Sequence, residues 1–450
     1  MYHTTSNPTA ISVSPTIIVF LALVTKIGYS LTDSSSSVNL QLPHIERGPA
    51  DTLKYLAHQC ECLGVHKFDV YGDFPTDDAS VENTSFLRTL EQEIAAEFGK
   101  EDAIFMPSGG MAQSIALLIH ARPGNKACGS RSKDGEPTTA HFACHHTSHL
   151  LLHEQDAYRD LLQMEPIIIS TIDEADGIHV PPMTFADIRR VIGMHPCKPE
   201  TLILELPHRE IGGKLTPWND VMRIREYCTE QDIKFHLDGA RIFEATSGYN
   251  DISLREIASA FDSVYISFYK GLGGLAGAML LGDKDFIDQA RIWLRRFGGN
   301  LYTLMPYAVS GWTGFRRQWR LESQDDSESL LSFQNKKDKL VHIVKELSKD
   351  PEISNIVTFD PAMPETNMVH GYLRYSVEEC NAALDQVESK LGIRVLVRVR
   401  PVEVTTDPAY KYGYRSRFEW AIGESNGKIP NKTFLLGWRA FAKIILQSQL

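Results

Sequence analysis

Apolar residues recur along the chain in two alternating patterns, one with the period of a helix and one typical of a buried strand. Residues 85–99 place Leu87, Leu90, Ile94 and Phe98 on one helical face and end at a glycine. Strands, largely apolar on both faces, are expected at residues 103–106, 166–170, 201–206, 233–238 and 263–268. Further helices are expected at residues 108–120, 184–193, 217–230 and 253–260.

Strands that alternate with helices predict an α/β fold with a mostly parallel sheet covered on both sides. The strand at 276–282 follows a tight glycine turn, which allows it to run antiparallel. A long polar helix, residues 326–349, is expected to lead into a smaller C-terminal α+β domain. We therefore divide the chain into a poorly ordered extension, a large domain and a small domain, comprising residues 1–45, 46–325 and 326–450.

The composition excludes several classes of protein. The 450 residues are 43% hydrophobic and 23% charged, typical of a globular protein with room for two domains. The net charge of −11 and the lack of a basic block with interleaved aromatics argue against a nucleic-acid partner. The seven cysteines form no CxxC pair, which indicates reduced thiols in the cytoplasm and neither a zinc site nor a disulfide framework.

The apolar stretch at residues 16–24 is too short to span a bilayer. The first basic residue, Lys26, follows this stretch, whereas a signal peptide carries basic residues before it. A poorly ordered extension is the preferred interpretation, and a divergent signal or anchor is the alternative.

A lysine among glycines is the first candidate for chemistry. In "DSVYISFYKGLGGLAG" (262–277), Lys270 ends an apolar strand and meets glycines that let the backbone turn and approach a ligand. A solvated lysine needs no such setting. A lysine that forms an imine with a carbonyl cofactor needs a lowered pKa, a fixed position and surrounding space.

Two further motifs follow predicted strands, where open α/β sheets bind ligands. Ser108, Gly109 and Gly110 open a helix, whose first N–H groups can hold a phosphate, although such a sequence is more often a simple cap. Asp238 ends a buried strand and needs a cationic partner. A protonated pyridine nitrogen would be one partner. An ion pair with Arg241 or a loop cap is the structural alternative, and for this motif alone it is the more common case.

Histidines gather in "HHTSHLLLHEQDAY" (145–158), but no pattern of metal ligands appears, and we expect no metal site. His149 can stack on a flat aromatic ligand, and His208 follows a strand end, where a lone histidine is more often structural. Together, a phosphate cradle, a stacking histidine, an aspartate for a pyridinium and a lysine predict a pyridoxal 5'-phosphate (PLP) site. They also occur in the chain order of fold-type-I PLP enzymes.

The chain resembles the threonine aldolase/aromatic amino acid β-eliminating lyase family over about residues 60–310 and less clearly beyond. The matching stretches are "DVYGDFPT" (69–76), "LEQEIAAEFGKEDAIFMPSGGMAQ" (90–113), "SHLLLHEQ" (148–155), "LELPHREIGGKL" (204–215), "HLDGARIFEA" (236–245) and "YKGLGGLAGAMLLGDKDFI" (269–287).

The resemblance implies a role for each candidate around the cofactor. It implies a fold-type-I large domain in which Lys270 bonds PLP, Asp238 partners the pyridine nitrogen and His149 stacks on the ring. Arg241 is similar to the arginine near the phenolic oxygen, and residues 108–110 match the phosphate loop.

The resemblance also implies how substrate is bound. His208 would meet the substrate's β-hydroxyl, Arg417 would hold its carboxylate, and Tyr71 would contribute to substrate binding. The chain departs from the family pattern in four places. The usual Arg-Ser-Asp-Thr near the N-terminus is not evident, and "ERGPADT" (46–52) is the nearest stretch. Gly110 stands for a threonine, Arg209 for an asparagine, and Tyr302 for an arginine that reaches a neighbouring subunit's phosphate.

The implied activity is cleavage of a threonine-like β-hydroxy-α-amino acid to glycine and an aldehyde. β-Elimination or racemisation on the same scaffold stays open, because a fold does not fix a reaction. A non-catalytic relative is the alternative of another class. The family also implies a homodimer or homotetramer, since fold-type-I sites usually form at a dimer interface.

Overall fold

The computed structural model describes residues 37–66, 85–121, 139–171, 178–323, 330–404 and 407–448. The chain divides into two units, Met1–Val38 and Asn39–Leu450. Apart from β1, which begins at Val38, the elements described below belong to the second unit. Within the described ranges, no helix is long and apolar enough to cross a membrane.

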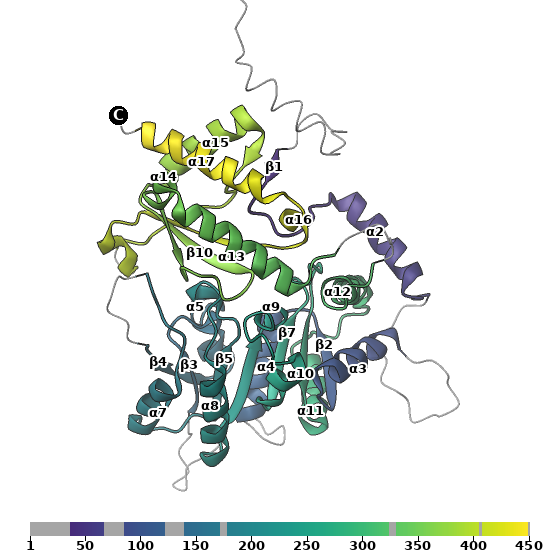
Figure 1. Cartoon of the computed structure of the whole chain (residues 1–450). Helices are drawn as coiled ribbons and strands as arrows, with labels where there is room; N and C mark the ends of the chain where they lie inside the picture. The colour runs from purple at the N-terminus through teal and green to yellow at the C-terminus, as the bar shows by residue number, and fades with distance from the viewer. Residues whose placement is uncertain are drawn as a thin grey trace, which may run out of the picture. The chain divides into compact units, whose positions relative to one another are not determined.

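Seven strands form the central sheet, in the order β2-β8-β7-β6-β5-β3-β4 (Figure 1). The five strands from β7 to β4 run parallel, whereas β8 lies antiparallel between β7 and β2. The expected mostly parallel sheet and the antiparallel strand after the glycine turn are thereby confirmed. The strands are β2 (Asp102–Met106), β3 (Ala140–His145), β4 (Met164–Ile169), β5 (Thr201–Glu205), β6 (Lys234–Gly239), β7 (Ser263–Ser267) and β8 (Ala278–Gly282).

Helices cover both faces of this sheet because its strands are apolar on both sides. On β7, Val264 and Ile266 lie in a core that also contains Ile94 of helix α3, whereas Tyr265 faces the opposite core, with Ile115 of helix α4. The first face carries α3 (Phe86–Phe98), α7 (Phe185–Met194), α8 (Trp218–Glu230) and α10 (Leu254–Ser259), and the second carries α4 (Gly109–Ala121) and α11 (Lys284–Arg296).

The C-terminal part forms a second, antiparallel sheet in the order β12-β13-β10-β9. Its core also contains Leu40, and Gln41 Nε2 donates to the carbonyl of Glu419 at 2.8 Å. Leu40 and Gln41 therefore pack in this C-terminal core, although they fall in the expected extension. The elements are β9 (Val357–Asp360), β10 (Met368–Leu373), β12 (Arg400–Pro401), β13 (Ser416–Ala421), α13 (Phe333–Lys349), α15 (Val377–Leu391) and α17 (Asn431–Gln447).

The fold class is confirmed, an α/β domain with a smaller C-terminal sheet domain, but two elements differ from expectation. Strand β3 was not predicted, and it lies between β5 and β4. The described part of the long polar helix begins at Phe333, after the N-cap Ser332. The remaining elements are β1 (Val38–Asn39), α2 (Pro49–Cys62), α5 (His149–His153), α6 (Ala157–Asp160), η1 (Arg209–Ile211), α9 (Ile242–Ala245), α12 (Met305–Gln318), α14 (Pro351–Ser354), β11 (Ile393–Arg394), η2 (Pro408–Tyr412) and α16 (Glu424–Gly427).

Candidate active site

Two carboxylates lie side by side where the parallel strands end. Glu205 is the last residue of β5 and stands in register with Asp238 on β6. Asp238 is in turn in register with Tyr265 on β7, five residues before Lys270. The carboxyl edge of three neighbouring strands thus places these charged groups in one region, as expected for a ligand site in an open α/β sheet.

Asp238 is buried and accepts two hydrogen bonds from neutral donors. Gln113 Nε2 donates to Oδ2 at 2.5 Å, and the backbone N–H of Ala240 donates to Oδ1 at 3.1 Å. Burial, followed by the charge of Glu205, raises the pKa of Asp238 to about 7, while His149 acts in the opposite direction. A buried carboxylate without a bonded cation fits the protonated ring nitrogen of PLP. The alternative ion pair with Arg241 does not form, and that arginine contacts Glu419 instead.

Lys270 lies in the tight connection between β7 and β8. A Cβ on Gly271 would collide with the carboxylate of Glu244, which would have to move, and Gly273 has a φ of +72°, which favours glycine. Burial, followed by Arg241 and Arg209, lowers the pKa of Lys270 to about 8. A partly neutral, half-buried amine is suited to bond a carbonyl carbon.

Helix α4 begins at the predicted phosphate loop and is closely packed there. A Cβ on Gly109 would collide with the hydroxyl of Tyr265, and one on Gly110 would lie 2.6 Å from Glu154 Oε2. A side chain at position 109 would therefore clash with Tyr265, and one at position 110 would have to displace Glu154. The backbone N–H groups of the loop remain suited to a phosphate. The carboxylate of Glu154 fills the space that a threonine side chain at position 110 would need.

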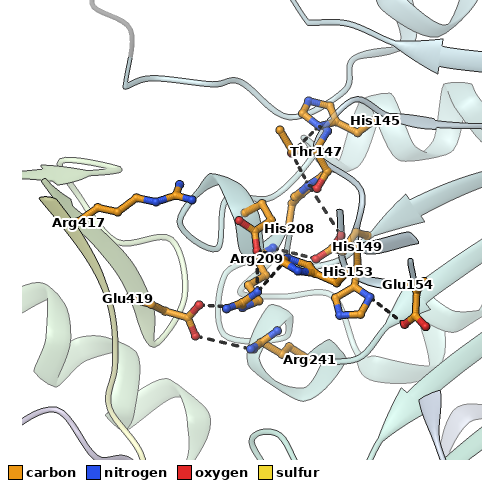
Figure 2. Close-up of polar contacts among 12 residues, drawn as sticks. His145, Thr147, His149, His153, Glu154, His208, Arg209, Arg241, Arg417 and Glu419 are labelled. Carbon is orange, nitrogen blue, oxygen red and sulfur yellow. Dashed lines mark hydrogen bonds and ion pairs between the residues drawn. The ribbon is translucent and has the colours of Figure 1, made fainter. Parts of the chain in front are cut away.

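His149 opens the short helix α5 and pairs with an acidic residue. Its Nδ1 lies 3.2 Å from Glu154 Oε1, and this contact raises the pKa of His149 against the opposing effect of burial (Figure 2). Its ring also lies against His153, with 4.9 Å between the ring centroids. Glu154 thus connects the stacking candidate to the start of α4.

His208 is almost fully buried, and one of its ring nitrogens is already occupied. Nε2 lies 3.0 Å from Thr147 Oγ1, which lies 2.8 Å from Nδ1 of His145. Glu205 Oε2 stands 3.7 Å from the same Nε2, without a hydrogen bond. Among the described residues, no hydrogen bond occupies Nδ1 of His208, so this nitrogen remains for a ligand.

The C-terminal sheet contributes a glutamate and an arginine to the same region. Glu419 lies between two arginines, 2.7 Å from Arg209 Nε and 3.6 Å from a terminal nitrogen of Arg241 (Figure 2). Arg417 lies two residues earlier on β13, hence on the same face. Its one ion pair among the described residues is a 3.9 Å contact with Asp407, which leaves it suited to a carboxylate.

The structure brings most of the predicted residues together and adds others. Tyr71 lies outside the described residues. Sequence reasoning missed Gln113, Glu154, Glu205 and Glu419. Glu205 could have been identified from the sequence, because it ends an apolar strand as Asp238 does. Gln113 and Glu419 acquire their partners only through tertiary contacts, and Glu154 pairs with the nearby His149.

Comparisons with known proteins agree with this geometry. The family model described as "Beta-eliminating lyase" matches residues 71–374. A low specificity L-threonine aldolase of Escherichia coli K12 is 30% identical over 268 residues, 59% of this chain and 71% of its own. An uncharacterized protein of Caenorhabditis elegans, R102.4, is 32% identical over 227 residues, 50% of this chain and 49% of its own. The chain thus spans about half the length of this relative.

A solved structure aligns over a greater length. A putative L-allo-threonine aldolase of Listeria monocytogenes has a TM-score of 0.71 and 30% identity, covering 91% of this chain and 96% of its own. A structure of SPT with PLP shares the fold, with a TM-score of 0.58 and 14% identity, covering 96% of this chain and 97% of its own. The family match extends over more than half of the sequence and includes Lys270, Asp238 and the start of α4. The chain belongs to the beta-eliminating lyase family.

Proposed function

We propose that this protein is a PLP-dependent lyase that cleaves threonine-like β-hydroxy-α-amino acids to glycine and an aldehyde. The observation that carries the proposal is the buried Asp238, which accepts hydrogen bonds from two neutral donors. It lies on β6, next to β7, the strand that precedes Lys270. The aldolases among the relatives support the choice of reaction.

The residues present would hold each part of PLP. Lys270 would bond the aldehyde carbon, Asp238 would accept from the ring nitrogen, His149 would stack on the ring, and Ser108–Gly110 would bind the phosphate. Arg241 would lie near the phenolic oxygen. When bound, PLP supplies the aldehyde that takes up an amino group and a ring that draws electrons away from Cα.

The protein's own side chains would orient the amino acid and move its β-hydroxyl proton. Arg417 would hold the α-carboxylate, because its guanidinium is only weakly paired. His208 would take the β-hydroxyl proton at Nδ1 while Thr147 fixes the ring through Nε2. Glu205, 3.7 Å from that ring, would stabilise the resulting positive charge. A positioned base of this kind typically contributes about 10²–10⁴-fold.

The proposal extends to assembly and location, which the family and the cysteines support. We propose a homodimer or homotetramer, in which Tyr302, 64% exposed, faces a neighbouring subunit. The cysteines in the described part of the chain are free, which supports a reducing, cytoplasmic environment.

The test compares His208→Asn with His195→Asn. Among the described residues, the hydrogen bonds of the His195 ring are to the backbone of Cys197 in its own loop. His208→Asn should retain PLP and still bind glycine, because neither step involves a β-hydroxyl, but should lose threonine cleavage by about 10²–10⁴-fold. His195→Asn should keep its activity. A purified protein that releases pyruvate or the opposite enantiomer, but no aldehyde from any β-hydroxy amino acid, would favour the elimination or racemase alternative.

A further inference from the structure

A continuous chain of buried hydrogen bonds runs from Asp238 into the second face of the sheet. Gln113 Nε2 donates to Asp238 at 2.5 Å, and Gln113 Oε1 lies 2.7 Å from Nε2 of His236. His236 Nδ1 lies 2.7 Å from Ser263 Oγ, which lies 2.7 Å from Nε2 of His120. Four successive contacts thus join five side chains.

Helix α4 and strand β6 position most of the side chains that form these hydrogen bonds. Gln113 and His120 are seven residues apart on α4, so they point to the same side of the helix. His236 and Asp238 are two residues apart on β6 and share one face of the strand. The strand and the helix that covers it therefore hold the chain in place.

The hydrogen bonds have only one consistent direction when Asp238 is ionised. Burial lowers the pKa of both His120 and His236 to about 3, so each ring is neutral at pH 7 and carries one N–H. Because Gln113 must donate to the carboxylate, its oxygen must accept from His236 Nε2–H. Nδ1 of that ring then accepts from the hydroxyl of Ser263. Reversing the direction of these hydrogen bonds would turn the amide oxygen of Gln113 towards the carboxylate of Asp238. Two acceptors would then face each other.

We propose that Gln113 is a positioning residue for the cofactor, which favours the ionised form of the Asp238 carboxylate and orients it to bind the ring nitrogen. The chain through His236, Ser263 and His120 fixes the direction of its amide. An amide fixes the direction of hydrogen bonding but is a poor proton carrier. The series of hydrogen bonds therefore orients Asp238 without passing a proton to it. The inference rests on the proposed cofactor site and is independent of the reaction catalysed there.

The experiment titrates the apoprotein with two ligands, PLP and its carbocyclic analogue, in which a C–H replaces the ring nitrogen. Gln113→Met removes the donor with little change in volume. It should weaken PLP binding by about 10–100-fold, as expected for a lost hydrogen bond to a charged group. Binding of the analogue should change by less than about threefold, the scale of a few tenths of a kcal/mol. Gln59→Met is the matched control, because Gln59 is as buried as Gln113 but lies on α2.

Equal losses for both ligands would show that Gln113 only supports the local packing, and an unchanged PLP affinity would also overturn the proposal. Ser263→Ala tests the distant part of the chain. It should weaken PLP binding in the same direction by about 3–10-fold, the scale of a neutral hydrogen bond. An unchanged affinity in that variant would refute the role of the chain in fixing the amide.

A second variant covers the possibility that Gln113→Met does not fold, which thermal unfolding of the apoprotein would reveal. Gln113→Glu keeps the shape but places a carboxylate against Asp238. Its PLP affinity should improve as the pH falls, because a shared proton restores one donor, whereas that of the wild type should weaken as Asp238 protonates. The other charged groups acting on Asp238 (Glu205, His149 and Arg241) are unchanged in both proteins. Identical pH profiles would contradict the proposal.

Discussion

The lowered pKa of Lys270 leads to a direct prediction for the apoprotein. At pH 7, an amine with a pKa of 10.5 is about 0.03% neutral, whereas one with a pKa of about 8 is about 9% neutral. The neutral fraction of Lys270 is therefore about 300 times that of an ordinary lysine at this pH. Reductive methylation with a limiting amount of formaldehyde should label Lys270 ahead of exposed lysines, together with Lys100 and Lys336, whose pKa burial also lowers to about 8.

Competitive labelling followed by peptide mass spectrometry would measure this effect. The labelling rate of Lys270 should rise with pH and level off above about 8, and the exposed Lys54 serves as the internal reference. Arg241→Gln should move the midpoint upward, because Arg241 lowers the pKa. This substitution should not restore the pKa of Lys270 to 10.5, since burial is the largest cause of the lowered pKa. A rate that keeps rising to pH 10 in the wild type would refute the reasoning.

Three further predictions concern the surroundings of the site. Gly110→Thr should weaken PLP binding by displacing Glu154, and adding Glu154→Ala should recover part of the affinity; no recovery would disprove the steric conflict. Glu419→Gln should move the labelling midpoint of Lys270 to lower pH, because Glu419 raises that pKa; an upward movement would contradict the electrostatic interpretation. Tyr302→Arg should slow PLP loss during dialysis by providing a charge-assisted hydrogen bond, about twice as strong as a neutral one; equal or faster loss would show that this loop does not face a phosphate.

The fold was predictable because its helices and strands differ in hydrophobic period. Residues 85–99 carried a helical stripe, a serine before it and a terminal glycine, and α3 begins after Ser85 and ends at Gly99 with a φ of +64°. Strand β3 was not predicted because "AHFACH" contains two histidines and lies beside a polar, turn-rich segment. Its identity as a strand depends on its position between β5 and β4, which no local pattern shows.

The candidate site was predictable as far as its residues follow strand ends. Asp238 and Lys270 could be found in this way, and so could Glu205. Gln113 could not, because a polar residue inside an apolar helix has no meaning until its partners, Asp238 and His236, are known. The role of Glu419 is also tertiary, since it is 178 residues from Arg241 in the chain and reaches it from another sheet.

The departures from the family pattern bear on whether the site is catalytic. Gly110 lacks the side chain of the family's threonine, but the carboxylate of Glu154 fills that space and also pairs with His149. Arg209 stands for an asparagine, and its charge is balanced by Glu419 at 2.7 Å.

A relative that had lost its function would be expected to leave such changes uncompensated, with cavities or unpaired charges around the cofactor region. Here two of the substituted positions, 110 and 209, are matched by new partners. Lys270 keeps the burial and lowered pKa that its proposed role requires, and Asp238 stays buried with only neutral hydrogen-bond donors. The combination favours an enzyme whose substrate contacts have changed over a non-catalytic relative. Arg209 directly follows His208, the proposed contact of the substrate's β-hydroxyl. We therefore expect this protein to differ from its relatives in the substrate side chain that it accepts and not in how it binds the cofactor.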